Sequence, residues 1–561
     1  MLFLLLAILV VVPQISQHAL VLGGDSLFHF NRFFDTEQQI EHGNFQYFIS
    51  TYGFSQSGRI INALYGPYIA YLNGLILYIF KSWFAYQIVT DIFVLFVAGI
   101  SMYYLAMSNK INHVSAVFIS LLYMLTYGVT TWTTGQQFLA WGAMLIPLGL
   151  SVATRLIRDK KNPILILEMS IVTSLFIETH ILSTLFLILI YIPFFIISIV
   201  VSHDKKRLFY KVGISTIITS ILTSNVWFGM LQVYTSNDLL APFYNKYPLQ
   251  NGVVTLTTNG RVYYLILIIY LIQIGMILFK VCKVTMLNRI VTILGAFLFI
   301  CTLPVVPWNY IFEHIRFVSI IQFPYRLLPF AEALLLLGVG LTLTNITDQK
   351  RDHNIEKLIM FVVVCLSLVF VQNKVYTQSL YWHSNSNVIA YKTNVTATEN
   401  GARLREYFSS SNLGAPFAHI WKPTPDYVPI NKDAHMDHPY EQYNNEVAKN
   451  SSIKTTNNDG VTVSWYSKDK SYYNTGLFKY KNTRIKINGK PAVSSQYYTT
   501  DIGTIMIKSS IGKNVVNISY RISAAMKIAL FISILSWIAL IITLFFNIIR
   551  HRTMIKRSQL P

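Results

Sequence analysis

Charged residues are scarce in this chain: Asp, Glu, Lys and Arg make up 12% of its 561 residues, whereas hydrophobic residues make up 53%. A soluble domain carries about 25% charged residues. Many uninterrupted apolar runs reach or approach the ~20 residues that a helix needs to cross a bilayer. The shortage of charge therefore excludes an ordinary soluble domain and predicts a polytopic membrane protein, mostly α-helical.

Cysteine is also scarce. Cys282, Cys301 and Cys365 all lie in or beside apolar segments, and no pair has the spacing of metal ligands. The polar stretch near the C-terminus contains no cysteine. Disulfide bonds therefore do not hold that stretch together.

Acidic residues are outnumbered by basic ones, 25 against 45, and the net charge is +20. We find no nucleic-acid-binding motif, and most Lys and Arg residues lie in short loops between apolar runs. Inner loops of membrane proteins have this composition. The charge therefore predicts no nucleic-acid partner, and it suits contact with anionic membrane lipids.

Loop charge also predicts a topology. The last apolar run, 524–549, is followed by RHRTMIKR, which belongs in the cytoplasm. Working backwards, basic loops alternate with less basic ones at every step. The predicted inner loops are 108–113, 155–162, 202–211, 280–289 and 347–357, and the predicted outer ones are 133–137, 179–183, 235–261, 309–326 and 377–521. This pattern predicts about twelve spanning helices in the cell membrane, with both termini cytoplasmic.

The run 61–80 decides on which side Asp25 lies. If this run spans the membrane, Asp25 is cytoplasmic. Its proline, two glycines, asparagine and several tyrosines are more typical of an interfacial or re-entrant helix. We favour that interpretation, which makes 23–84 a first external loop lying on the membrane, within a transmembrane unit of residues 1–376.

The polar stretch 377–521 forms a second predicted unit. Its second half alternates polar and apolar residues in VTVSWYS, TGLFKYKNTRIKINGKPA, GTIMIKSS and NVVNISYR, with NGK and IGK as turn signals. Period-two alternation between turns is typical of antiparallel strands. We therefore expect a small, β-rich, sandwich-like domain outside the cell, followed by a unit of residues 522–561 with the last helix and a basic tail.

The stretch GGDSLFHFNRFF carries the first candidate site. Gly23 and Gly24 interrupt the first helix, and Asp25 suits the N-cap of a new one. His29 and Arg32 then share a helical face with Asp25. One interpretation is a capped amphipathic helix, and the other is a functional site. Asp-x-x-x-His would supply two metal ligands, but no third is evident. We therefore assign no metal ligand and no cofactor, and a divalent metal ion stays an open alternative.

Further motifs follow in order along the chain. They are YGFSQSGR and ALYGPYIAYL, TTGQQFLAWGAMLIPL, ETHILST with His180, IQFPYRLL with Gln322 and Arg326, and PDYVP with Asp426 and Tyr427. Together with GGDSLFHFNRFF, they make nearly the whole chain resemble the YfhO-like family of bacterial membrane proteins, which is related to pyruvoyl-tetrahydropterin-synthase-related membrane proteins. That family resembles GT-C glycosyltransferases. Gln136 or Gln137 stands where the family usually has Glu.

The resemblance implies a membrane glycosyltransferase. It would take a sugar from a polyprenyl phosphate outside the cell and pass it to a cell-envelope polymer, such as teichoic acid, or to a glycolipid. Asp25 would be the catalytic base, with His29 beside it, and the planar guanidinium of Arg326 suits a phosphate. A membrane anchor is the alternative for Arg326, and a structural role is the alternative for His180. The residues implied in substrate binding are Arg32, Arg59, Gln137, His180, Arg316, Gln322 and Arg326.

Two acidic residues inside apolar segments, Asp91 and Glu332, are secondary candidates. Buried acids are costly and are therefore functional or paired, and Arg326 is a potential partner of Glu332. Two other classes of function remain. A transporter would favour polar residues at mid-membrane on broken helices and repeated halves. A non-enzymatic envelope scaffold would not need Asp25, His29 and Arg326 to converge.

Overall fold

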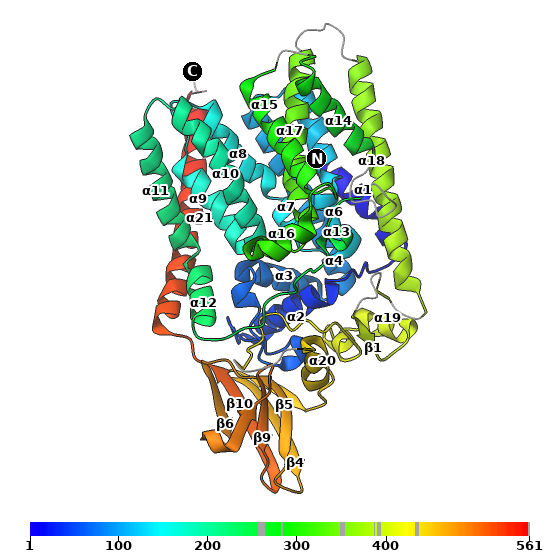
Figure 1. Ribbon diagram of the computed structural model, residues 1–561, viewed down its shortest axis with the longest axis vertical. Coiled ribbons are helices and arrows are strands. Elements are labelled where there is room, and N and C mark those ends of the chain that lie inside the picture. The colour runs from blue at the N-terminus through cyan, green and yellow to red at the C-terminus, as the bar shows by residue number, and fades with distance from the viewer. Residues whose placement is uncertain are drawn as a thin grey trace.

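The computed structural model describes residues 1–255, 264–281, 284–347, 354–385, 388–389, 394–431 and 437–558. Long helices form a bundle, and a group of β-strands lies beyond one end of it (Figure 1). Cys282 lies outside the described residues. The predicted mostly helical membrane architecture with a small β-rich region near the C-terminus is confirmed.

Among the described residues, seven helical segments are long and apolar enough to cross a membrane, and a bent pair makes a possible eighth. The seven comprise α4 (Trp83–Ser108), α5 with α6 (His113–Met124, Tyr127–Gly135), α7 with α8 (Leu139–Ala143, Ile146–Arg158), α10 (Ile181–Val201), α17 (Leu328–Thr347), α18 (Asn354–Leu380) and α21 (Ala524–Ser558). The bent pair is α11 (Lys205–Leu222) and α12 (Ser224–Tyr234), which meet at 68°.

The other four helices that the sequence counted as spans are shorter. They are α1 (Leu2–Ser16), α9 (Ile166–Thr179), α14 (Tyr264–Leu278) and α15 (Met286–Cys301), with 14 to 16 residues each. At 1.5 Å per residue they measure roughly 21–24 Å, less than the ~30 Å of a bilayer core. The count of twelve, and the side on which each end lies, therefore stay predictions.

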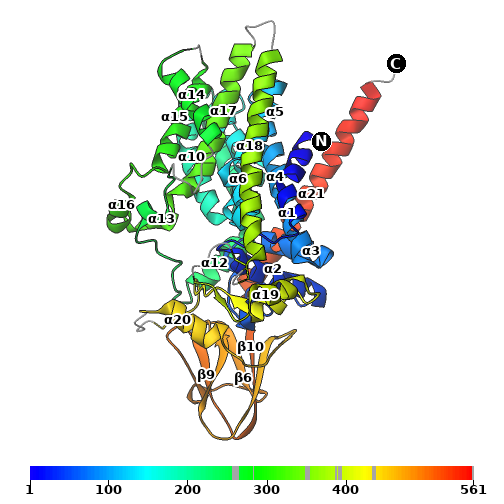
Figure 2. The same cartoon turned by 90° about the vertical axis from the view of Figure 1, so that its right-hand side faces the viewer.

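Helices α2 (Ser26–His42) and α3 (Pro67–Phe80) lie at the end of the bundle nearest the β-strands (Figures 1 and 2). A Cβ on Gly74 would lie 2.3 Å from Thr36 Oγ1, so α3 packs closely on α2. The Thr36 hydroxyl also donates to the Ala70 carbonyl at 2.9 Å. With 14 residues, α3 is roughly 21 Å long. This is the length of α9, so helix length does not separate the two, and the expectation that the run 61–80 does not cross stays a prediction.

Glycines set the two ends of α2. A Cβ on Gly23 would lie 1.9 Å from the Gly135 carbonyl oxygen, so the chain before α2 lies against the end of α6 only because this residue is glycine. At the other end, Gly43 has a φ of 66° and closes the helix in the left-handed conformation. The start of α2 is thereby fixed against the bundle.

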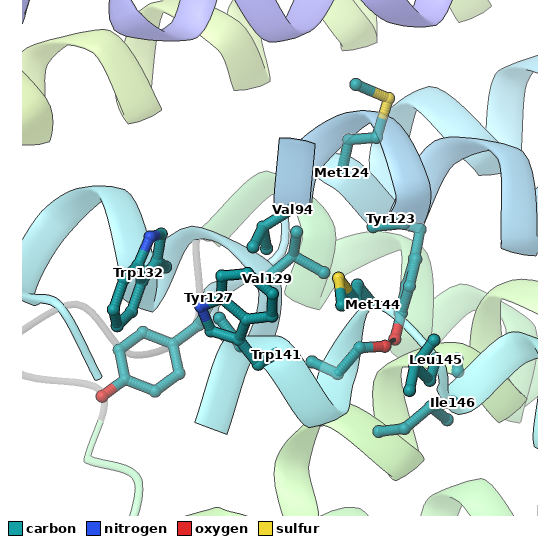
Figure 3. Packing of buried hydrophobic residues seen from close by; sticks show 14 of the residues in the cluster. Val94, Tyr123, Met124, Tyr127, Val129, Trp132, Trp141, Met144, Leu145 and Ile146 are labelled. Atoms are coloured by element: carbon teal, nitrogen blue, oxygen red, sulfur yellow. Dashed lines mark hydrogen bonds between the residues drawn. The ribbon is translucent and has the colours of Figure 1, made fainter. Parts of the chain in front are cut away.

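Aromatic and aliphatic side chains from α4, α5, α6, α7 and α8 fill the centre of the bundle (Figure 3). The rings of Trp132 and Trp141 lie 5.9 Å apart in an edge-to-face arrangement. The buried Tyr123 hydroxyl donates to the Ala143 carbonyl at 2.7 Å. This packed core holds α6 rigidly beside the start of α2.

The β-rich region consists of two antiparallel sheets. One has the order β3-β4-β10-β6-β7 and the other β5-β9-β8, and their inner faces share a core that includes Val463, Ile507 and Val516. The strands are β3 (Lys454–Asn457), β4 (Gly460–Ser467), β5 (Tyr472–Phe478), β6 (Thr483–Ile487), β7 (Lys490–Pro491), β8 (Tyr497–Thr499), β9 (Thr504–Lys508) and β10 (Gly512–Tyr520). The predicted antiparallel strands are confirmed.

Short elements connect the bundle to this region. Between α18 and β3 lie β1 (Thr396–Ala397) paired with β2 (Ile420–Trp421), and the helices α19 (Gly401–Ser409) and α20 (Pro439–Tyr443). In both views this segment lies between the bundle and the β-sheets, next to α2 (Figures 1 and 2). Two further short helices, α13 (Pro248–Asn251) and α16 (Trp308–His314), precede α17.

Candidate active site

Asp25 stands at the N-cap position of α2, but its carboxylate does not accept a capping hydrogen bond. The side chain is 56% exposed, and its Oδ1 lies 3.3 Å from the Nζ of Lys422. Lys422 also donates to the neighbouring Gly24 carbonyl at 2.6 Å. The capping interpretation therefore does not account for this carboxylate, which instead faces an ammonium group from a distant part of the chain.

His29 lies one turn further along α2 and is buried. Its ring stacks on Phe138 with 4.9 Å between centroids, and its Nδ1 lies 3.4 Å from an Nη of Arg32. Burial, and secondly the charge of Arg32, hold the pKa of His29 well below its ordinary value. The imidazole is therefore neutral at physiological pH and suits hydrogen bonding and packing rather than carrying a positive charge.

Arg32 is fully buried. Its Nε donates to Asn62 at 3.1 Å, a terminal nitrogen donates to the Tyr65 carbonyl, and its guanidinium lies 4.7 Å from the Tyr65 ring centroid. Burial lowers the pKa of Arg32 to about 10, so it stays charged at neutral pH. Arg32 holds the chain before α3 against α2, and its role in substrate binding stays a prediction.

Arg59 links the first loop to the segment beyond the bundle. It is fully buried, and its donors reach the Asp426 carbonyl at 2.6 Å, Thr424 Oγ1 at 3.3 Å and the Tyr443 hydroxyl at 3.4 Å. The guanidinium also lies 5.0 Å from the Phe54 ring centroid. Arg59 therefore fixes residues 424–426 beside the start of α2.

Tyr65 marks the centre of the charged cluster. Its ring lies within about 6 Å of the rings of His29 and His180, with centroid distances of 6.2 and 6.1 Å. Burial raises the pKa of its phenol, and the nearby positive charges of Arg32 and Arg326 oppose this shift. The negative charges of Asp25 and Asp426 also raise the pKa of this phenol. Tyr65 thus lies near side chains from four other segments: residues 25–32, His180, Arg326 and Asp426.

His180 and Arg326 approach this centre from the bundle side. His180 is buried between α9 and α10, with its Nδ1 2.7 Å from Ser183 Oγ. Arg326 donates to Gln322 Oε1 at 2.7 Å, and Gln322 in turn donates to the Phe243 carbonyl at 2.5 Å. The predicted Gln322 and Arg326 therefore form one hydrogen-bonded unit. Arg316 is exposed, at the start of the short helix Arg316–Ile321.

The remaining predicted residues lie within the bundle. Glu332 is buried and accepts from the Gly128 N–H at 3.2 Å, at the start of α6, so the suggested pairing with Arg326 is wrong. The free N–H groups of a helix start compete well for a carboxylate. Asp91 is also buried, with Gln136 among its nearest polar neighbours, and Gln137 is half-buried.

Sequence reasoning missed Lys422 altogether. Asp426 was identified only through the family resemblance. Burial and the charges of Arg59, Asp25 and Lys422 all affect the pKa of its carboxyl. Burial raises the pKa of Asp426, and Arg59 opposes this shift. A cavity of about 20 Å³ beside Lys422, lined also by Phe28 and Thr424, has room for a water molecule.

Within the described ranges, no three His, Cys, Asp or Glu side chains are grouped closely enough to hold a metal ion. The cluster instead combines the exposed carboxylate of Asp25, which faces Lys422, with the positive charges of Arg32 and Arg326 near Tyr65. Such an arrangement binds anions and places one base beside them, and we therefore consider it the candidate active site.

No family model matches the chain, and no curated protein matches it. Similar solved structures include arabinofuranosyltransferase AftD from mycobacteria, with 13% identity and a TM-score of 0.43, and the apo oligosaccharyltransferase of Archaeoglobus fulgidus, with 13% identity and a TM-score of 0.31. The matches cover 67% and 77% of this chain, but only 27% and 61% of those proteins.

Proposed function

We propose that this protein is a membrane glycosyltransferase that moves a sugar from a polyprenyl-phosphate donor to a cell-envelope acceptor. The observation that carries the proposal is the placement of Asp25. Its exposed carboxylate lies at the end of the helical bundle, 3.3 Å from Lys422. The charges of Asp25 and Arg326 both affect the pKa of Tyr65, which relates the two residues to the same side chain. A base and phosphate-binding cations are what such a transfer needs.

The reaction forms one bond and breaks another. An acceptor hydroxyl oxygen attacks the anomeric carbon of the sugar while the bond from that carbon to the phosphate oxygen breaks. Asp25 takes the proton of the hydroxyl, and the lipid phosphate leaves with the electron pair of the broken bond. A positioned base contributes about 10²–10⁴ in rate, and Arg326 stabilises the charge that grows on the phosphate.

The position of the cluster suits a lipid-linked donor. Helix α2, which carries part of the cluster, lies where the helical bundle ends and the β-rich region begins (Figure 1), and we place this level at the depth of the lipid phosphates. We place this end of the bundle outside the cell, in line with the loop-charge topology. Nucleotide sugars are absent there, so the lipid phosphate is the leaving group, and an envelope polymer or glycolipid is the acceptor.

The proposal is tested by replacing Asp25 with Asn in the chromosomal copy and comparing envelope glycans with those of wild-type and deletion strains. Asn is as good a helix cap as Asp, so Asp25→Asn should leave the fold intact. We expect the sugar modification that disappears in the deletion strain to fall about 100-fold or more in the Asp25→Asn strain.

Asp459→Asn serves as the matched control, because Asp459 is an exposed carboxylate in the turn between β3 and β4. It should keep the wild-type level of modification. A wild-type level in the Asp25→Asn strain as well, at equal protein abundance in the membrane, would contradict the transferase proposal.

A further inference from the structure

Lys422 approaches the candidate base from outside the helical bundle. It follows β2 directly and is 397 residues away from Asp25 in sequence. Two contacts fix its position: the Trp421 indole N–H donates to Asn444 at 2.7 Å, and Thr424 accepts from Arg59 at 3.3 Å. The contact with Asp25 therefore belongs to a built junction and not to a freely moving side chain.

The Lys422 ammonium retains capacity for a further partner. An ammonium has three N–H donors. Among the described residues, it donates to two acceptors, the Gly24 carbonyl and the Asp25 carboxylate. Its side chain is 20% exposed and lines the small cavity between α2 and the segment that contains Thr424. An anion that approaches Asp25 therefore comes close to an ammonium group with a third N–H donor.

The pair between Lys422 and Asp25 is easy to exchange. The carboxylate is 56% exposed, and such ion pairs contribute little because water solvates both partners when they separate. A phosphate group carries more negative charge than a carboxylate and has more acceptor oxygens. It is therefore the stronger partner for an ammonium.

We propose that Lys422 binds the phosphate of the lipid-linked donor and gives up Asp25 to do so. The inference rests on the proposed function, because it assigns the donor's phosphate to this site. Without donor, Lys422 occupies the Asp25 carboxylate. When the phosphate arrives, the ammonium turns to it, and the freed carboxylate faces the acceptor hydroxyl. No covalent bond changes in this exchange, so donor binding itself prepares the base.

The exchange is tested by calorimetric binding of geranyl phosphate to the full-length protein in detergent, with geraniol as the phosphate-free control. Lys422→Ala should raise the Kd for geranyl phosphate about 10-fold or more, because a charge-assisted contact is lost. Asp25→Asn should lower the Kd several-fold, because the competing carboxylate is removed. In the double variant the gain from Asp25→Asn should disappear, since the ammonium that it frees is absent.

Lys486→Ala is the matched control: Lys486 is an exposed lysine on β6, and its replacement should leave the Kd unchanged. If Lys422→Ala lowers the melting temperature of the protein, the Asp25→Asn variant carries the test. Unchanged or weaker binding of geranyl phosphate by Asp25→Asn overturns the exchange, as does a wild-type Kd in a folded Lys422→Ala variant.

These outcomes are separable from those of the transferase proposal, because binding is measured without acceptor or turnover. Loss of the envelope sugar in the Asp25→Asn strain, together with a wild-type Kd in Lys422→Ala, rejects the exchange alone. The expected Kd changes with unaltered envelope glycans reject the transferase and keep the phosphate site.

Discussion

Two aspartates on helix α2 have opposite surroundings. Asp25, at the start of the helix, is exposed and faces a single ammonium group. Asp35, in the middle, is buried, and one of its oxygens accepts the backbone N–H groups of Thr51, Tyr52 and Gly53 at 2.8, 2.8 and 3.1 Å. Its other oxygen accepts from Gln39 at 2.9 Å.

The difference separates structural from functional carboxylates. Asp35 has all its acceptor capacity committed to holding the loop at 51–53, and no ligand can reach it. Asp25 contributes little to the fold and stays accessible. A carboxylate that the fold does not need, placed beside a cation, is the better candidate for chemistry. Three substitutions on α2 test this contrast, in order of decreasing expected effect.

The largest effect is expected for Asp35→Ala. It leaves three buried backbone N–H groups and the Gln39 amide without an acceptor, at about 1–3 kcal/mol for each unpaired group. We expect a loss of about 4 kcal/mol or more, measured as thermal unfolding in detergent. Asp25→Ala is the control, with a change below about 1 kcal/mol. Equal destabilisation by both variants would contradict the contrast.

A smaller effect is expected from pH. Burial outweighs the hydrogen bonds and raises the pKa of Asp35 from 3.8 to about 6. The folded protein therefore binds this proton more tightly than the unfolded chain does. Its contribution to stability is present below pH 3.8 and is lost as the pH rises to about 6, a change of about 3 kcal/mol.

Asp35→Asn removes this titration. The difference in melting temperature between wild type and Asp35→Asn should therefore shift between pH 4 and pH 6, with the wild type losing stability relative to the variant as the pH rises. A difference that stays constant across this range would show that Asp35 does not titrate there.

The smallest effect is expected for Glu41→Gln, near the end of the same helix. The Glu41 carboxylate lies 2.7 Å from Lys81 Nζ, and both side chains are more than 40% exposed. Exposed ion pairs of this kind contribute about 0–1 kcal/mol. The variant should melt within about 2 °C of wild type. A larger loss would mean that exposed carboxylates on α2 do support the fold, Asp25 included.

Local sequence signals were enough to predict helix α2. The Gly-Gly pair predicted where the helix begins, and the spacing of Asp25, His29 and Arg32 gave them a common face, whereas its end at Gly43 came from the structure. Residues on that face differ in burial in the structure: Asp25 is exposed, whereas Arg32 is fully buried. Periodicity shows which residues share a side, but the loop with Asn62 and Tyr65 decides which of them it covers.

Long-range partners were beyond prediction. Lys422 lies in WKPTPDY, which has neither helical nor strand periodicity, and its partner is 397 positions away. The pairing of Glu332 was predicted wrongly for a similar reason, since Arg326 is near in sequence whereas the Gly128 N–H is near in space. Loop charge predicted the order of crossings, but it contains no information on helix length, so the number of full spans was left undecided.

The contacts of Arg59 also impose an order on assembly. This residue is synthesised early, but its hydrogen-bonding partners Thr424, Asp426 and Tyr443 come 365 to 384 positions later. A ribosome adds roughly 5–20 residues per second, so the first loop waits on the order of tens of seconds for them. The candidate site around Asp25 is therefore completed only near the end of synthesis, and a truncated chain would display the Asp25 carboxylate without the segment that faces it.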